Sequence, residues 1–226
     1  MSAKVLTLAL DASTYIGTVA VLRDSAVIAE CAAAMRGEDE ERLMPAVIAT
    51  LADAGCTVAD VQRVICGAGP GSFTSLRIAG AIAKGIAFGN DVSLFAVSSL
   101  ALIVAGCQPP LKAGRYVALL DAMRAERYAS LFDVSANGVV RELESLGRIA
   151  DADSAATCER LSARAIGPRE SHEAAPHARG VASLLELVIA AGPVSLDHWE
   201  PAYGRLAEAQ VKWEAAHGRA LSVDDA

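Results

Sequence analysis

The stretch between residues 64 and 88 joins an apolar strand to a helix through a turn that leaves little room for side chains. The apolar run Val64–Cys66 stops at Gly67, and Gly-Pro-Gly-Ser-Phe-Thr follows at residues 69–74. A helical pattern then covers Ser75–Phe88. Glycine adopts backbone dihedrals that other residues resist, and we expect Gly71 to need a positive φ. The pattern therefore predicts a strand, a tight loop and a helix N-terminus.

Two interpretations of this loop stay open from the residues alone. Such a loop can bind an anion through its backbone N–H groups. It lacks the Lys-Ser/Thr ending of a P-loop, and Ser72 stands where a dinucleotide-binding fingerprint has its third glycine. The alternative is a helix start, capped by Ser72 or Thr74, that binds no ligand.

Asp11 ends the first apolar strand, and Ser13 and Thr14 lie in the turn behind it. A carboxylate there can hold a metal–nucleotide, and the hydroxyls can meet a phosphate. The alternative is an Asx-turn that closes a hairpin. The phosphate-loop interpretation as a whole comprises Asp11, Ser13, Thr14, Gly69, Gly71, Ser72 and Thr74.

Length and charge limit the class of protein. The chain has 226 residues and a net charge of −7, which predicts one or two domains and argues against a large nucleic-acid footprint. Its five cysteines form no Cys-x-x-Cys motif, and its four histidines have no metal-ligand spacing. The start has no signal-peptide layout, and no apolar run is long enough to span a membrane. We expect a cytoplasmic protein with no membrane partner and no metal.

The order of the predicted elements indicates an α/β protein. The first half reads β-β-β-α-β-α-β-α and forms an N-terminal lobe at residues 1–108. Its elements are strands Val5–Leu10, Thr18–Leu22, Val27–Ala33, Arg63–Gly67 and Leu94–Val97, and helices Glu38–Ala54, Ser75–Phe88 and one that ends at Gly106.

A Pro109-Pro110 break opens a C-terminal lobe with a tail, at residues 109–226. Strands are expected at Tyr116–Asp121, Glu126–Asp133 and 163–166, with a hairpin turn at Asn137-Gly138. Helices are expected at 150–162 and 180–191, a loop at 168–180, and a short helical stretch in the tail to about residue 217. Asp121, Arg124, Glu126 and Arg127 form a charged corner that is either a site or a solvated turn.

Small residues repeat every fourth position on the helix Ser75–Phe88, at Ala79, Ala83 and Ala87. They allow another backbone to approach closely. One interpretation is packing on the chain's own sheet, and the other is contact with a second subunit. The second predicts a dimer or partner interface made of Leu43, Val47, Leu51, Leu76, Ala79, Gly80, Ala83 and Ala87.

Several motifs resemble one family in the family's own order. They are Asp11–Thr14, Arg42–Pro45, residues 69–78, Ala96–Leu100 and Pro201–Arg205. The chain resembles the TsaB (YeaZ) family, a bacterial partner in threonylcarbamoyladenosine synthesis on tRNA. The resemblance implies an actin/hexokinase-like (ASKHA) fold, with two similar lobes of mixed sheets flanked by helices. It also implies a scaffold that pairs with TsaD and the ATPase TsaE, dimerises when alone, and meets tRNA only through the complex.

The resemblance also implies that the chain has no independent activity within the threonylcarbamoyltransferase complex. The catalytic relative carries two metal-binding histidines where this chain has Ser99 and Ile103. We therefore expect no catalytic residue and no cofactor of its own, with a nucleotide at a subunit interface as an option. The chain departs from the family at Ser75 and Ala79, where glycine is usual, and around Asp39, where a histidine is usual.

Two other functions are carried as alternatives. One is an ATPase or sugar-kinase-like enzyme of the same fold, which uses Asp11 and the loop at residues 69–74 for phosphates. The other is an M22-type peptidase, for which the sequence offers no nucleophile or metal set. Calorimetric titration with Mg-ATP separates the first of these from the scaffold.

Overall fold

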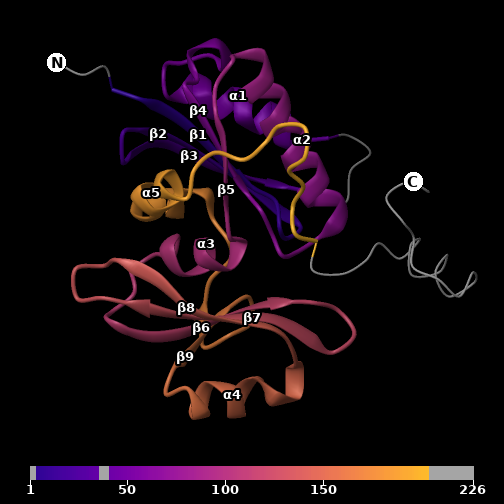
Figure 1. Ribbon diagram of the computed structural model, residues 1–226, viewed down its shortest axis with the longest axis vertical. Helices are drawn as coiled ribbons and strands as arrows, with labels where there is room; N and C mark the ends of the chain where they lie inside the picture. Colours follow the sequence, from indigo (N-terminus) through magenta and orange to yellow (C-terminus); the bar gives the residue numbers. More distant parts are fainter. Residues whose placement is uncertain (1–3, 36–40, 204–226) are drawn as a thin grey trace, which may run out of the picture.

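Two five-stranded sheets, stacked one above the other, form the framework of the molecule (Figure 1). The computed structural model describes residues 4–35 and 41–203. The strand order of the first sheet is β3-β2-β1-β4-β5. Its strands are β1 (Leu6–Asp11), β2 (Ile16–Arg23), β3 (Ala26–Ala34), β4 (Arg63–Gly67) and β5 (Leu94–Val97).

The second sheet has the order β10-β9-β6-β7-β8. Its strands are β6 (Gly114–Asp121), β7 (Glu126–Val134), β8 (Val140–Ala150), β9 (Arg164–Gly167) and β10 (His172–Glu173). The predicted Asn137-Gly138 turn joins β7 to β8, with Gly138 at φ 81°.

The two sheets share one connectivity. The first strand of each, β1 or β6, pairs antiparallel with the next strand and parallel with the strand after the crossover, β4 or β9. The crossover helix is α1 (Leu43–Asp53) in the first lobe and α4 (Ser154–Arg160) in the second. Between the last two strands the first lobe has α2 (Phe73–Gly89), and the second has only a short turn. The predicted fold of two similar lobes is confirmed.

The helices form three layers around the two sheets (Figure 1). Helices α1 and α2 cover the outer face of the first sheet, and α4 covers the outer face of the second. Helix α3 (Ser99–Ala105) and helix α5 (Val181–Ala190) pack into the core that both sheets share. Large side chains from each side meet there, including Leu22, Ile103 and Tyr116. The lobes are therefore held together by a common apolar core.

The C-terminal segment returns to the first lobe. Residues 193–203 run along it, where the Val194 N–H donates to the Leu94 carbonyl at 2.8 Å and the Ala202 N–H donates to the Ala68 carbonyl at 2.7 Å. The boundary predicted at residue 108 separates the two sheets. Residues 193–203 follow that boundary in the sequence, but they pack on the first lobe.

Several predicted element bounds change. Helix α1 begins at Leu43, where the Glu41 carboxylate accepts hydrogen bonds from the first N–H groups. The earlier part of the predicted helix, at residues 38–40, lies outside the described residues. The helix predicted at 150–162 is a 3₁₀ turn at Asp151–Asp153 followed by α4, and the loop predicted at 168–180 contains β10. The predicted helical stretch of the tail also lies outside the described residues. Within the described ranges, every helix is too short or too polar to cross a membrane.

Candidate functional site

The sheet brings Asp11 and the glycine-containing loop together. Strands β1 and β4 are parallel neighbours, with Leu10 opposite Cys66, so both chains leave the sheet at the same edge. Two residues of the predicted phosphate loop, Thr14 and Thr74, do not join this group. The Thr14 hydroxyl binds the backbone of Ile16, and Thr74 lies exposed in the first turn of α2.

Asp11 is completely buried, and its carboxylate is bound by the chain itself. One oxygen accepts hydrogen bonds from the Ser13 N–H at 2.9 Å and the Ser13 hydroxyl at 2.7 Å. The other accepts from the Ser99 hydroxyl at 2.5 Å. Burial raises the pKa of Asp11, and the hydrogen bonds from Ser99 and Ser13 oppose that shift. This geometry is the Asx-turn of the structural interpretation.

The backbone N–H groups of the loop at residues 69–74 also donate hydrogen bonds to other parts of the chain. The Gly69 N–H donates to the Ser99 hydroxyl at 3.1 Å, and the Ser72 N–H donates to the Ser13 carbonyl at 2.7 Å. A Cβ at Gly71 would collide with the Ser13 backbone, and a Cβ at Gly69 would lie 2.5 Å from the Ala202 carbonyl. Because the chain's own atoms occupy the space inside the loop, the structure favours a structural role over an anion site.

The start of α2 differs from the predicted cap. Ser72 is the N-cap residue, but its side chain makes no capping hydrogen bond and lies 3.0 Å from the Ser75 hydroxyl instead. Thr74 is inside the helix. The predicted side-chain cap is therefore wrong.

The two positions that correspond to the metal-binding histidines of the catalytic relative have structural contacts. Ser99 and Ile103 are both fully buried. Ser99 joins Asp11 to the Gly69 backbone, and Ile103 packs in the shared core of the two lobes. In the part of the chain that the structure describes, no three or more His, Cys, Asp or Glu residues gather as a metal site.

The raised pKa of Asp11 gives a testable pH dependence. Folding favours the protonated carboxyl, so its contribution to stability is complete below the ordinary pKa of 3.8 and is lost as pH rises through the folded pKa. We expect the free energy of unfolding of Asp11→Asn, relative to wild type, to increase as pH rises above 3.8, the ordinary pKa of the carboxyl. Urea denaturation at several pH values measures it.

Asp60 supplies the matched control. Hydrogen bonds from Thr57 lower its pKa, so its contribution to stability is lost as pH falls. Asp60→Asn should therefore lose stability relative to wild type as pH rises, which is the opposite trend. A pH-independent difference between Asp11→Asn and wild type contradicts the prediction.

The predicted interface residues are buried inside the first lobe. Leu43, Val47, Leu51, Leu76, Ala79, Ala83 and Ala87 have at most 1% of their surface exposed, and Gly80 faces Pro201 and Trp199. The small-residue stripe packs α2 on the chain's own sheet and on the returning C-terminal segment. These eight residues are buried and are not available to another subunit, which corrects the prediction.

The opposite side of the same two helices is exposed and largely apolar, with the exposed Arg77 one turn before Ala81 on α2. Phe88 is 80% exposed and Ile48 is 53% exposed. We use the name outer helix face for the exposed residues Pro45, Ile48, Ala49 and Ala52 of α1 with Ala81, Gly85 and Phe88 of α2. This exposed face could have been predicted from the sequence, because its residues alternate with the buried ones at helical spacing.

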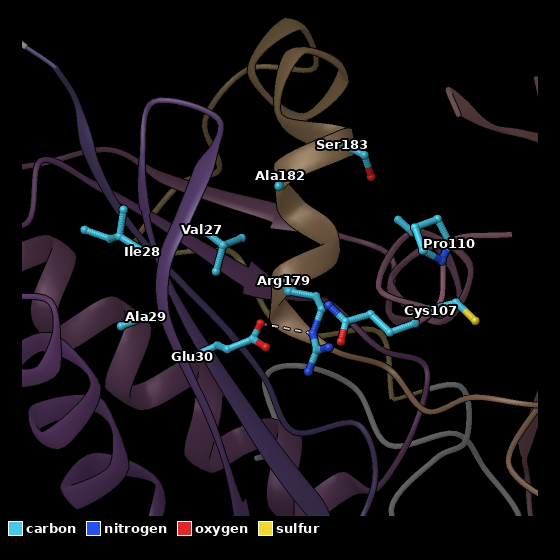
Figure 2. Close-up of a pocket in the computed structure, with 11 residues that line it drawn as sticks. Val27, Ile28, Ala29, Glu30, Cys107, Pro110, Arg179, Ala182 and Ser183 are labelled. Carbon is cyan, nitrogen blue, oxygen red and sulfur yellow. Dashed lines mark ion pairs between the residues drawn. The ribbon is translucent and has the colours of Figure 1, made fainter. Parts of the chain in front are cut away.

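A pocket of about 500 Å³ lies on the other side of the first sheet, between β3, the turn after α3 and α5. Glu30 and Arg179 both line it, and their side chains point toward each other and form an ion pair at 3.0 Å (Figure 2). Arg179 also donates to His177, whose pKa is lowered to about 4 by burial and by this guanidinium. The two charges neutralise each other, so they offer no free charge to a ligand.

Comparisons with known proteins agree with the fold. The chain matches the family model of TsaD, tRNA N6-adenosine threonylcarbamoyltransferase, over residues 35–172, which is more than half of its length. A solved structure of YeaZ from Pseudomonas aeruginosa is 26% identical, has a TM-score of 0.71, and covers 88% of this chain and 99% of that one. The tRNA threonylcarbamoyladenosine biosynthesis protein TsaB of Bacillus subtilis (strain 168) is 33% identical over 141 residues, 60% of this chain.

The chain belongs to the TsaD-related TsaB (YeaZ) family. TsaB of Escherichia coli (strain K12) is likewise 33% identical, over 132 residues and 58% of this chain. The matches span 58% of the B. subtilis protein and 57% of the E. coli protein, so the chain aligns with less than two thirds of each. The family and the two-lobed fold predicted from the motifs are confirmed.

Proposed function

We propose that this TsaB-family chain is a non-catalytic scaffold subunit of the assembly that forms N6-threonylcarbamoyladenosine on tRNA. It pairs with a TsaD subunit, and the ATPase TsaE joins the pair. The names of its curated relatives support the pathway, and the match to the TsaD family model supports a partner of similar fold. The tRNA meets the chain through the complex, in the cytoplasm.

The outer helix face is the observation that carries the proposal. Exposed apolar residues gathered on one surface mark a protein contact. Phe88 supplies an aromatic anchor, and aromatic residues dominate the energy of many interfaces. The side chains of Ala49 and Ala81 are small, so the backbone of another helix can approach this surface closely. The same pair of helices from a TsaD subunit, or from a second copy when the chain is alone, can pack on this face as a helical bundle.

The site described above supports the scaffold over an enzyme. An ATPase or sugar kinase needs free groups for phosphates, and here Asp11 and the amides of Gly69 and Ser72 bind other parts of the chain. We expect the purified chain to modify no tRNA when supplied with ATP, threonine and bicarbonate. Addition of TsaD, TsaE and the enzyme that makes the adenylate should restore modification, and turnover by the chain alone would overturn the proposal. A nucleotide at the interface between subunits is compatible with it.

Phe88→Asp tests the proposed face. We expect it to fold normally and to bind TsaD at least about 30-fold more weakly, because loss of an interface anchor costs about 2 kcal/mol or more. Calorimetric titration measures the affinity, and light scattering measures the dimer of the chain alone. Circular dichroism and a melting curve check the fold.

Leu187→Asp is the matched control. Leu187 is 50% exposed on α5, on the other side of the first sheet. It should leave both affinities unchanged. If Phe88→Asp binds TsaD as tightly as Leu187→Asp does, the outer helix face is not the interface.

A further inference from the structure

Gly85 lies inside helix α2, and no contact within the described chain explains why it is glycine. Glycine weakens a helix relative to alanine. A Cβ at Gly85 would meet no atom of the described residues within 4 Å, and its φ is not positive. Gly80, on the same helix, differs because it faces the returning C-terminal segment. The missing Cβ at Gly85 leaves room for the backbone of another molecule to come close.

The exposed residues of α2 around Gly85 fit a second copy of the same helix. Ala81 lies about one turn before Gly85, and Phe88 lies about one turn after it. Both are exposed, and the midpoint between them is next to Gly85. When two copies of α2 pack antiparallel across a two-fold axis at this midpoint, Phe88 of each copy lies over Ala81 of the other. A large side chain then meets a small one twice, as close packing requires.

The same axis brings opposite charges together at the ends of the two helices. Arg77 and Asp91 are both exposed, and neither forms an ion pair with another described residue. A helix rises about 1.5 Å per residue, so Arg77 lies about 11 Å from the axis in one direction and Asp91 about 10 Å in the other. Antiparallel packing therefore places Arg77 of each copy beside Asp91 of the other.

The groups around Arg77 keep it available for this pairing. Its guanidinium lies over the Phe73 ring, 5.4 Å from the ring centroid, which holds it at the rim of the outer helix face. Lys84, the remaining cation of α2, is half-buried and follows Gly80 by one turn. Because Gly80 faces the returning C-terminal segment, Lys84 lies toward that segment as well.

We infer that the outer helix face binds a second copy of this chain through antiparallel α2 helices that cross at Gly85, and that Arg77 and Asp91 select this arrangement. Each residue contributes to the contact twice, because a two-fold interface is the same patch on both subunits. The inference rests on the proposed function, since it uses the same face. It adds the occupant, the crossing point and the two charged residues that determine self-pairing.

A charge exchange tests the inference. Arg77→Asp and Asp91→Arg should each raise the dimer Kd at least about tenfold, because each replaces two symmetric attractions by two repulsions. The double variant Arg77→Asp/Asp91→Arg should return the Kd to within about threefold of wild type. Light scattering over a dilution series at low salt measures the Kd. Since Arg77→Asp also loses the Phe73 ring, Asp91→Arg gives an independent measurement, and melting curves check the fold of all three.

Glu186→Arg is the control, because it makes the same charge change as Asp91→Arg on the exposed side of α5, away from the outer helix face. It should dimerise as wild type does. If the single variants dimerise as tightly as wild type, if the double variant is as weak as the singles, or if wild type is a monomer, the inference fails.

Titration with TsaD tests the proposed function separately. If the charge exchange fails but Phe88→Asp still binds TsaD more weakly than Leu187→Asp does, the proposed function stands without the inference. If the exchange restores the dimer but wild type binds no TsaD, the inference stands and the proposed function fails.

Discussion

Ala83→Glu is expected to unfold the first lobe. Ala83 is fully buried on the side of α2 that faces the sheet, in the core with Val64 and Val47. A carboxylate placed there has neither water nor a cationic partner, and a buried unpaired charge costs about 4 kcal/mol or more. Domains are stable by only about 5–15 kcal/mol, so a loss of this size is a large part of the total stability. Circular dichroism during heating and urea titration measure the loss.

Ala81→Glu is the control for that result. Ala81 is exposed on the outer side of the same helix, two residues away. The same substitution there should change the free energy of unfolding by no more than about 0.5 kcal/mol. If both variants melt at the same temperature, the orientation of α2 in the structure is wrong.

This pair also shows what the sequence could predict about the helices. The spacing of Ala79, Ala83 and Ala87 identifies residues on one side of α2. It does not say whether that side meets the chain's own sheet or another subunit, since both surfaces are apolar and close-packed. The strand order decides the question, because it places β1 and β4 directly beneath the helix.

The candidate site was predictable in part for a similar reason. The turn at Asp11 and the loop before α2 were recognisable from local sequence, and the parallel pairing of β1 and β4 brings them together. The groups that occupy them come from far away in the chain, namely Ser99 and Ala202. A local pattern contains no information on such distant partners, so it could not separate an Asx-turn from a phosphate site.

The backbone of the turn between β6 and β7, where Met123, Arg124 and Ala125 all have a positive φ, could not be predicted from the sequence. Asp-Ala-Met-Arg-Ala contains no Gly or Asn, the residues that mark positive φ in a sequence. Left-handed residues there are fixed by tertiary contacts with Asp151 and through Arg127. The charged corner was visible from the sequence, but its backbone conformation was not.

Gly71→Ala is expected to destabilise the protein by about 2–3 kcal/mol or more. The expectation of a positive φ at Gly71 is wrong, because the left-handed glycine of this loop is Gly69, at φ 84°. The reason for glycine at position 71 is space, since a Cβ there would meet the backbone of Ser13. Ser13 cannot move away easily, because its N–H binds Asp11 and its carbonyl accepts from Ser72.

Gly85→Ala makes the same change where the space is open. A Cβ at Gly85 meets no atom within 4 Å, and the residue lies on the exposed side of α2. Because alanine favours a helix over glycine, this variant should be more stable by up to about 1 kcal/mol. Urea denaturation of the two variants should therefore give changes of opposite sign. If Gly71→Ala is as stable as Gly85→Ala, the close contact between the two turns does not exist, and the loop at residues 69–74 regains the room that a phosphate site needs.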